Sequence, residues 1–130
     1  MIIIGHRFIP SKNFYHVQDI DAINNTPPSS CITVEFNEQN LDIINHATLN
    51  NVELALSVKN VTELIYAANL GATYIIVEKE LAQSAQKIAN EYLFDAKLLV
   101  SIQNEEEIET LALQSVDGAI FSNAIIKTPS

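Results

Sequence analysis

The sequence contains few of the residues on which several common kinds of site depend. Its 130 residues include one cysteine, three glycines and no tryptophan. The single Cys31 has no partner for an internal disulfide and no second thiol for a metal-binding pair. No two glycines lie close together, so the glycine-rich loops that cradle phosphates are missing. These shortages exclude a Rossmann dinucleotide site and a P-loop, and the G-x-S-x-G elbow of serine hydrolases is absent as well.

Positive charge is also scarce. Seven Lys and Arg residues stand against sixteen Asp and Glu residues, which gives a net charge of −9. The basic residues are scattered along the chain, whereas binding to a phosphate backbone needs a cluster of them that displaces counterions. We therefore expect no nucleic-acid partner and, for the same reason, no membrane surface as a partner.

Long apolar runs are absent too. No run approaches the roughly 18 residues of a membrane-spanning helix. The apolar start Met1-Ile-Ile-Ile-Gly5 is too short for a signal peptide and lacks a basic flank and a cleavage site. With 48% apolar and 18% charged residues the composition is that of an ordered protein, and 130 residues suit one domain. We expect a cytoplasmic protein in which residues 1–130 form a single α/β domain.

The sequence does contain a regular spacing of apolar runs. Five short β-branched runs begin at residues 31, 52, 73, 97 and 118, that is, at intervals of 21, 21, 24 and 21 residues. Helix-like stretches fill the gaps between them. Strands that alternate with single helices run parallel, because each crossover helix returns the chain to the same edge of the sheet. The spacing predicts tandem βα units from residue 31 onward. The predicted strands are Cys31–Phe36, Val52–Val58, Thr73–Val77, Lys97–Ile102 and Gly118–Phe121.

The gaps have helical periodicity and end signals. Asn60 followed by Glu63 is a cap signature, and Gly71 suits the left-handed turn after the helix that starts there. A second helix is expected from about Lys79 to Leu93, and a third from Asn104. The predicted buried stripes are Leu64, Ile65 and Ala68; Leu81, Ala85, Ile88, Ala89 and Tyr92; and Ile108, Leu111 and Ala112.

Two arrangements of such units fit one domain. The sheet opens into a three-layer sandwich of flavodoxin-like type, or it stays curved as a partial TIM-like barrel whose open edge pairs with another copy. Five or six strands cannot close a barrel that needs eight. We slightly favour the sandwich, because a half-barrel exposes apolar surface and strand edges. The shortness of the 21-residue units favours the barrel, and either arrangement predicts self-association.

The first 30 residues differ from the repeats. Ile2 to Phe8 has the composition of a strand, and Val17 to Ile23 fits a short helix. The turn-rich stretch from Asn24 to Ser30 then leads into the first repeat. Thirty residues cannot hold a core of their own, so we expect an N-terminal strand plus an arm packed on the repeats.

Polar side chains at the C-terminal ends of the strands are the candidates for chemistry, because loops and helix N-termini converge there. Glu35, Lys59 and Glu78 lie at or just after three consecutive strands, so we expect them to meet in one cleft. A lysine between two carboxylates can shuttle a proton or bind a small polar ligand. The alternative, which we prefer, is that these charges only end the buried runs and return the chain to water. The three residues are therefore catalytic candidates without an assigned step.

Histidines and neighbouring loop residues add further candidates. Ligand contacts are expected from His6, Arg7, Asn37 and Ser101. His6 and His16 flank the N-terminal arm and point toward the cleft with Glu35 in this interpretation, and two histidines with a carboxylate can bind a transition metal. Neither an HxH nor an HxxxH spacing is present, so we predict no metal site and no cofactor. Cys31, at the start of an apolar strand, is predicted to be a buried structural thiol.

Two stretches resemble a known family. They are Ala67-Ala-Asn-Leu-Gly-Ala-Thr-Tyr-Ile-Ile-Val77 and Glu109-Thr-Leu-Ala-Leu-Gln-Ser-Val-Asp-Gly-Ala-Ile-Phe121. In each, a helix ends in a small-residue turn and feeds a parallel strand. The pattern resembles the phosphate-sugar TIM barrels, nearest the 2-keto-3-deoxy-6-phosphogluconate aldolases, over roughly residues 52 to 121. The resemblance implies a barrel-like architecture.

The residues that carry the aldolase chemistry do not match the family. The family has a Schiff-base lysine inside a strand that follows an Asp-containing turn. This chain, with Asp117-Gly-Ala-Ile120, has Ile120 at that position. Glu35 stands where the family has an acid-base glutamate, but Phe36-Asn37-Glu38 replaces the arginine and threonine expected beyond it. The phosphate-binding glycine loops are missing as well. The resemblance therefore implies the architecture without the aldolase activity.

Two classes of function fit these observations. We favour a small non-catalytic domain that acts as a homodimer or by binding a partner protein, given the missing catalytic signatures and the aromatic arm around Phe8, Phe14 and Tyr15. The other class is a small metabolite-binding protein or lyase-like enzyme with its site at the C-terminal ends of the strands. The geometry separates the two classes by whether the candidates converge in one pocket. Those candidates are Glu35, Lys59, Glu78, His6 and Arg7.

Overall fold

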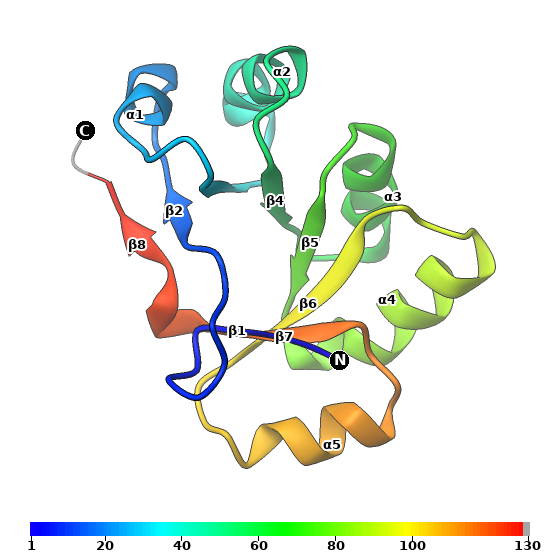
Figure 1. The fold of residues 1–130 in the computed structure, drawn as a ribbon. Coiled ribbons are helices and arrows are strands. Elements are labelled where there is room, and N and C mark those ends of the chain that lie inside the picture. The colour runs from blue at the N-terminus through cyan, green and yellow to red at the C-terminus, as the bar shows by residue number, and fades with distance from the viewer. Residues whose placement is uncertain (129–130) are drawn as a thin grey trace.

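The computed structural model describes residues 1–128 as a curled, all-parallel β-sheet with helices on its outer face (Figure 1). Within these residues the sheet has eight strands, in the order β1-β7-β6-β5-β4-β3-β2-β8. The strands are β1 (Ile2–Ile4), β2 (Phe14–His16), β3 (Cys31–Glu35), β4 (Leu54–Ser57), β5 (Tyr74–Val77), β6 (Lys97–Ile102), β7 (Gly118–Phe121) and β8 (Ile126–Lys127).

Helices connect successive strands from β2 to β7. They are α1 (Ile20–Asn24), α2 (Leu41–Leu49), α3 (Val61–Asn69), α4 (Lys79–Glu91) and α5 (Glu107–Leu113), with single 3-10 turns η1 (Glu38–Asn40) and η2 (Ser122–Ala124). The helix α3 begins as predicted, because the Asn60 side chain accepts a hydrogen bond from the backbone N–H of Glu63 at 2.8 Å. None of the helices in residues 1–128 is long and apolar enough to cross a membrane.

The predicted βα repeat is confirmed. Each of the five predicted strands is present with bounds within two residues of those expected, and a helix fills each gap. The first 30 residues contribute more than expected, because β1 pairs with β7 and β2 pairs with β3. They supply two strands of the sheet instead of one strand and a packed arm. Three residues, Phe14-Tyr15-His16, are too few to show a period of two in the sequence.

The sheet is curled, which is the second of the two arrangements considered from the sequence. The rings of Phe14 on β2 and Tyr74 on β5 have centroids 5.3 Å apart. These strands are three positions apart in the sheet, which in a flat sheet corresponds to about 14 Å. The inner face therefore closes on itself, and side chains of distant strands pack against each other across it.

The order of the strands explains why the flavodoxin-like sandwich, the arrangement favoured from the sequence, does not form. Strands β2 to β7 lie side by side in the order of the sequence. Right-handed crossovers between such neighbours place every helix on the same face, whereas a sandwich needs a point where the strand order reverses. With helices on one face only, the other face is buried by curling.

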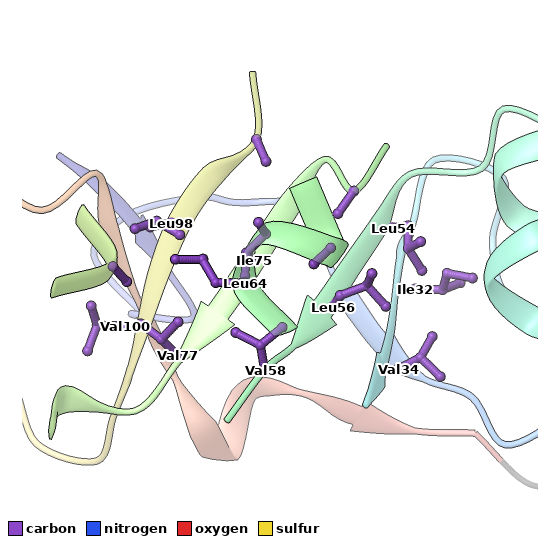
Figure 2. Close-up of a cluster of buried hydrophobic side chains, with 14 of the residues drawn as sticks. Ile32, Val34, Leu54, Leu56, Val58, Leu64, Ile75, Val77, Leu98 and Val100 are labelled. Atoms are coloured by element: carbon purple, nitrogen blue, oxygen red, sulfur yellow. The ribbon is translucent and has the colours of Figure 1, made fainter. Parts of the chain in front are cut away.

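Alternating side chains of each strand fill two apolar clusters. The larger cluster lies between the sheet and the helices and includes Ile32, Val34, Leu54, Leu56, Val58, Leu64, Ile75, Val77, Leu98 and Val100 (Figure 2). The smaller cluster lies on the inner face and consists of Ile4, Phe14, Cys31, Ala55, Ile76, Leu99 and Ile120, with Ile2, Tyr74 and Ile125 packed against it. This alternation shows which residues point inward.

One short segment holds both edges of the sheet. Strand β7 pairs with β1, and five residues after β7 ends, β8 pairs with β2 on the other edge. In Figure 1 the chain runs from β7 past the end of β1 to the side of β2. The close approach requires Gly5, whose φ is +95°, because a Cβ there would overlap Ala124.

The helices bury narrower stripes than the sequence predicted. Leu64 and Ala67 are buried on α3, while Ile65, predicted to be buried, is 38% exposed. The prediction that Tyr92 is buried is wrong, since its side chain is 71% exposed. The helix α4 ends at Glu91, and Tyr92 caps it beyond the face that packs on the sheet. The predicted burial of Ala112 on α5 is wrong too, because Leu111 alone is buried there.

Candidate functional site

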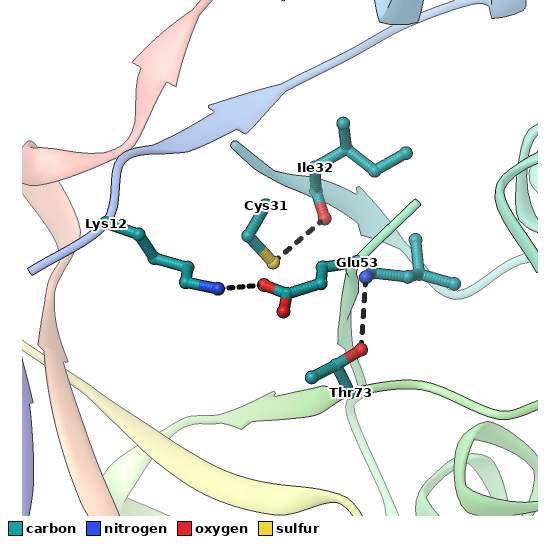
Figure 3. A network of polar contacts seen from close by, with 6 residues as sticks. Lys12, Cys31, Ile32, Glu53 and Thr73 are labelled. Carbon is teal, nitrogen blue, oxygen red and sulfur yellow. Dashed lines mark hydrogen bonds and ion pairs between the residues drawn. The ribbon is translucent and has the colours of Figure 1, made fainter. Parts of the chain in front are cut away.

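Polar side chains at the N-terminal edge of the sheet are paired with each other (Figure 3). Lys12, before β2, forms an ion pair with Glu53, before β4, and this hydrogen bond raises the pKa of Lys12. Thr73 Oγ1 accepts a hydrogen bond from the backbone N–H of Leu54 at 3.5 Å. These contacts tie the start of β4 to the segment before β2 and to the residue before β5.

Asp117 and Gln86 make a second set of paired contacts at this edge. The Asp117 carboxylate accepts a hydrogen bond from the backbone N–H of Leu98 at 3.0 Å. The backbone N–H of Asp117 in turn donates to Oε1 of Gln86 at 2.8 Å. Gln86 is a buried polar residue of α4, so its partner offsets the cost of its burial. The set joins α4, β6 and β7.

Cys31 lies beside the Lys12–Glu53 pair (Figure 3), and its thiol is unreactive. Its side chain is fully buried, and burial raises the pKa of the thiol to about 12. The thiolate is the reactive form of cysteine, so the buried thiol is protected near neutral pH. The prediction of a buried structural thiol is confirmed. Tyr74, whose ring packs on Phe14, also has a raised pKa, chiefly because of its burial.

The C-terminal rim over β6 and β7 is likewise paired. His6 Nε2 lies 2.9 Å from Glu105 Oε2, and the backbone N–H of Phe8 donates to His6 Nδ1 at 3.1 Å. The Glu107 carboxylate accepts hydrogen bonds from the backbone N–H groups at positions 103 and 104, at 2.8 and 3.0 Å, and lies 3.3 Å from the ammonium of Lys79. These donors lower the pKa of Glu107.

His6 and Arg7 therefore take no part in a common cleft with Glu35. The His6 ring packs against Phe121, which belongs to the cluster on the helix side of the sheet. The Arg7 guanidinium lies over the ring of Phe8, 4.5 Å from its centroid. His6 therefore lies on the helix side of the sheet, and neither residue lines the cavity described next.

The three strand-end candidates do lie together. Glu35, Lys59 and Glu78 line one cavity of about 460 Å³ at the C-terminal ends of β3, β4 and β5. The rest of its wall is formed by Ser57, Val58, Ile76, Glu80 and Leu81. Consecutive parallel strands bring the residues that follow them to the same edge, so the sequence was sufficient to place these three. The cavity holds three carboxylates and one ammonium.

The charged groups of this cavity are unpaired, although their backbone is fixed. Within residues 1–128, no hydrogen bond or ion pair holds the head group of Glu35, Lys59 or Glu78. The Glu35 carbonyl, by contrast, accepts a hydrogen bond from Asn40 Nδ2 at 2.8 Å, and the Lys59 backbone N–H donates to Glu63 Oε1 at 2.9 Å. The head groups are therefore available on a defined backbone.

Asn37 and Ser101 lie outside the cavity. Asn37 caps η1, since its side chain accepts a hydrogen bond from the backbone N–H of Asn40 at 3.0 Å. Ser101 lies in β6 opposite Ile120 and two residues after Leu99, so its side chain is on the inner face. Asn37 thus has a structural role, and Ser101 belongs to the inner surface beside the cavity.

Sequence reasoning missed three polar residues of this region. Ser57 and Glu80 line the cavity, and Thr33 lies on the inner face. His16, which was expected to point toward the cleft, lies beside Thr33 on the inner face and does not line the cavity. Strand alternation was the available signal for Ser57 and Thr33, because each lies two residues from an inward-facing small or apolar residue.

No group of three or more His, Cys, Asp or Glu side chains within residues 1–128 is arranged to hold a metal ion. The comparisons with known proteins add no assignment: neither a protein-family model nor a curated protein matches the sequence.

A larger, mostly apolar cavity of about 710 Å³ lies at the opposite edge of the sheet, where α3 and α4 end. Exposed Tyr92 and Leu93 form part of its wall. Leu93 is 84% exposed and has a φ of +53°, a strained value for a branched residue. The other lining residues are Ile65, Ala68, Asn69, Gly71, Ala72, Phe94, Asp95 and Ala96. We call this cavity the apolar groove.

Proposed function

We propose that this chain is a small cytoplasmic protein that binds a small polar molecule at the C-terminal edge of its curled sheet. The observation that carries this proposal is the convergence of Glu35, Lys59 and Glu78 on one cavity with their head groups unpaired. Ligands of parallel α/β proteins bind at this edge, where loops and helix N-termini meet. Over β6 and β7, by contrast, His6 is paired with Glu105 and Glu107 with Lys79.

The contacts of the cavity favour binding over catalysis. Covalent catalysis needs a nucleophile within hydrogen-bond reach of a base, and no such bond joins the lining side chains among residues 1–128. The aldolase resemblance places Ile120 where a Schiff-base lysine would be required. A lyase-like activity would therefore need Lys59 or a carboxylate as its proton-transfer group, and this stays the weaker form of the proposal.

A direct test is a thermal-shift screen of polar metabolites. A ligand that binds only the folded state raises the melting temperature. At a concentration of 100 times its Kd it adds about 2.7 kcal/mol to the free energy of unfolding. The shift should vanish in Lys59→Ala and persist in Lys87→Ala, which removes the same charge from an exposed position on α4 outside this cavity. Shifts that are equal in both variants would contradict the site.

The second candidate function is self-association, as a homodimer, or binding of a partner protein. The apolar groove supports it, because exposed apolar surface at a cavity marks interaction sites. Light scattering over a range of concentrations tests it. A dimer that Leu93→Ser converts to a monomer would support this function, whereas a monomer at all concentrations would remove the homodimer.

A further inference from the structure

The apolar groove lies beside a turn that differs from its equivalents. The second residue after each of the helices α2 to α5 has a positive φ, between +53° and +86°. Those residues are Asn51, Gly71, Leu93 and Ser115. Glycine and asparagine adopt this conformation readily, whereas a bulky side chain is strained in it. Leu93 is the only bulky apolar residue among the four.

Leu93 gains no burial in return for this strain. Its side chain is 84% exposed, and that of Tyr92 before it is 71% exposed. A leucine at a strained and exposed position stabilises neither the turn nor the core. Strained backbone of this kind is concentrated at functional sites in proteins. Both side chains border the groove, so the turn adds apolar surface to it.

The other wall of the groove is one face of α3. Ile65, Ala68 and Asn69 line it at the i, i+3 and i+4 spacing of a single helix face. The Asn69 side chain is held against its own helix, since its Nδ2 donates a hydrogen bond to the Ile65 carbonyl at 2.8 Å. A second helix packs along such a face, with its side chains between those of α3. The shape therefore favours a helical occupant.

The groove is negative as well as apolar. Asp95 lines it, and Glu91 lies in the last turn of α4. The lining residues, all within residues 1–128, include no Lys, Arg or His. Neither α3 nor α4 has a basic residue in its last turn, so the partial negative charge at each helix C-terminus is not offset by a side chain of that helix. A cationic partner supplies the missing charge.

The same charges disfavour a second copy of the chain as the occupant. In a two-fold dimer the same surface of each copy faces the other. The carboxylates of Glu91 and Asp95 would then face identical carboxylates, with no basic lining residue between them. The net charge of −9 adds to this repulsion. The groove is complementary in charge to a basic protein instead.

We propose that the apolar groove binds a basic amphipathic helix of another protein. Tyr92 and Leu93 pack against the apolar face of that helix, and Asp95 pairs with its Lys or Arg side chains. Apolar burial supplies the affinity, and the charges set the preference for a basic partner. This inference rests on the second candidate function, the binding of a partner protein, and names the chemistry of that partner.

Three designed peptides of about 14 residues test the partner chemistry. The first has leucines at the i, i+3 and i+4 spacing and lysines elsewhere. The second has glutamate in place of every lysine, and the third is a scrambled form of the first without an apolar face. Fluorescence anisotropy with the full chain should show the first peptide binding at least about tenfold more tightly than the other two. Equal or tighter binding of the acidic or the scrambled peptide would overturn the inference.

The variant Leu93→Asn tests the groove through opposite effects on stability and binding. Asparagine adopts a positive φ more readily, so the melting temperature should rise, while the affinity for the basic peptide should fall about tenfold because an anchoring side chain is lost. Phe8→Asn is the matched control, because it removes an exposed apolar side chain outside the groove and should leave the affinity unchanged. Wild-type affinity in Leu93→Asn would show that the groove is not the site.

The variant Asp95→Asn tests the charge. The affinity for the basic peptide should fall about threefold at low salt, and the loss should decrease at high salt because an exposed ion pair is screened. Glu109→Gln removes a charge from an exposed position of α5 outside the groove and should leave the affinity unchanged. Equal losses in the two variants would show that the peptide responds only to net charge, which would overturn the role of Asp95.

The outcomes separate this inference from the function on which it rests. A dimer that Leu93→Asn converts to a monomer, with no peptide bound, would show that a second copy fills the groove; the inference is then wrong and the second candidate function stands. If the chain is a monomer and no peptide binds, both fail. Neither result bears on the rim cavity, because no residue lines both cavities.

Discussion

The two edges of the sheet treat their polar side chains differently. At the N-terminal edge Lys12 is paired with Glu53, and Asp117 accepts a hydrogen bond from the chain. At the C-terminal edge of β3 to β5, Glu35, Lys59 and Glu78 have no such partners within residues 1–128. The paired edge fixes the starts of the strands, and the unpaired one leaves its groups available. The difference separates polar residues that stabilise the fold from those free to meet another molecule.

The largest change in stability should come from the inner face of β6, which runs from the apolar cluster at Leu99 to the polar C-terminal edge at Ser101. Leu99 and Ser101 both point inward from β6, but Leu99 is fully buried in the inner apolar cluster. Leu99→Ala should lower the free energy of unfolding by about 2–5 kcal/mol, through lost burial and a cavity. Ser101→Ala should change it by less than about 0.5 kcal/mol. Urea denaturation measures both free energies of unfolding. Similar losses would contradict the distinction between the inner apolar cluster and the polar C-terminal edge.

An intermediate effect is expected when a carboxylate is removed from each edge. Asp117→Ala leaves the Leu98 backbone N–H without its partner, which should destabilise the fold by about 1–3 kcal/mol. Glu78→Ala, at the unpaired edge, should be within about 0.5 kcal/mol of the wild type. The comparison fails if Glu78→Ala is the more damaging change in denaturant melts.

The Lys12–Glu53 pair should contribute less. Both side chains are more than a third exposed, so the surrounding water weakens their attraction. Lys12→Met should cost about 0.2–1 kcal/mol, with the loss decreasing at high salt because the pair is screened. A double-mutant cycle with Glu53→Gln measures the coupling energy of the pair. A value of zero would show that the pair does not stabilise the N-terminal edge.

The smallest effect concerns acid. The pKa of Glu107 is lowered in the folded state, so its ionised form adds stability above the unfolded pKa of about 4.3. That contribution is lost as the pH falls through the lower folded pKa. Glu107→Gln should therefore reduce the acid sensitivity of the melting temperature below about pH 4.5. Glu106→Gln, on the same turn, serves as the control. Identical pH profiles for wild type and Glu107→Gln would count against the lowered pKa.

The sequence was sufficient for the repeat and for the meeting of Glu35, Lys59 and Glu78, because both follow from local periodicity and the parallel rule. It was insufficient for β2 and β8, which have three and two residues and gain their order from partners far along the chain. For the same reason the placement of His6 was not predictable. Its neighbours Glu105 and Phe121 are about a hundred residues away in sequence.

The choice between an open and a curled sheet was not settled by the sequence, although the short 21-residue units favoured the curled one. Apolar runs buried on both faces read the same in a sandwich and in a barrel. The distinction depends on strand order, which periodicity does not contain. The buried Thr33 hydroxyl, which lacks a hydrogen-bond partner within residues 1–128, could be recognised as such only once its neighbours on three strands were known.

The segment that joins β7 to β8 has a consequence for how the protein is made. Ile2 pairs with Gly118, and Tyr15 pairs with Ile126. Strands β1 and β2 therefore gain these partners only after residues more than a hundred positions later have been synthesised. Contacts this distant slow folding, because a long loop must close before they form. A nascent chain therefore carries two unpaired strand edges until residues 118–127 emerge from the ribosome, and aggregation with other chains is most favoured during that interval.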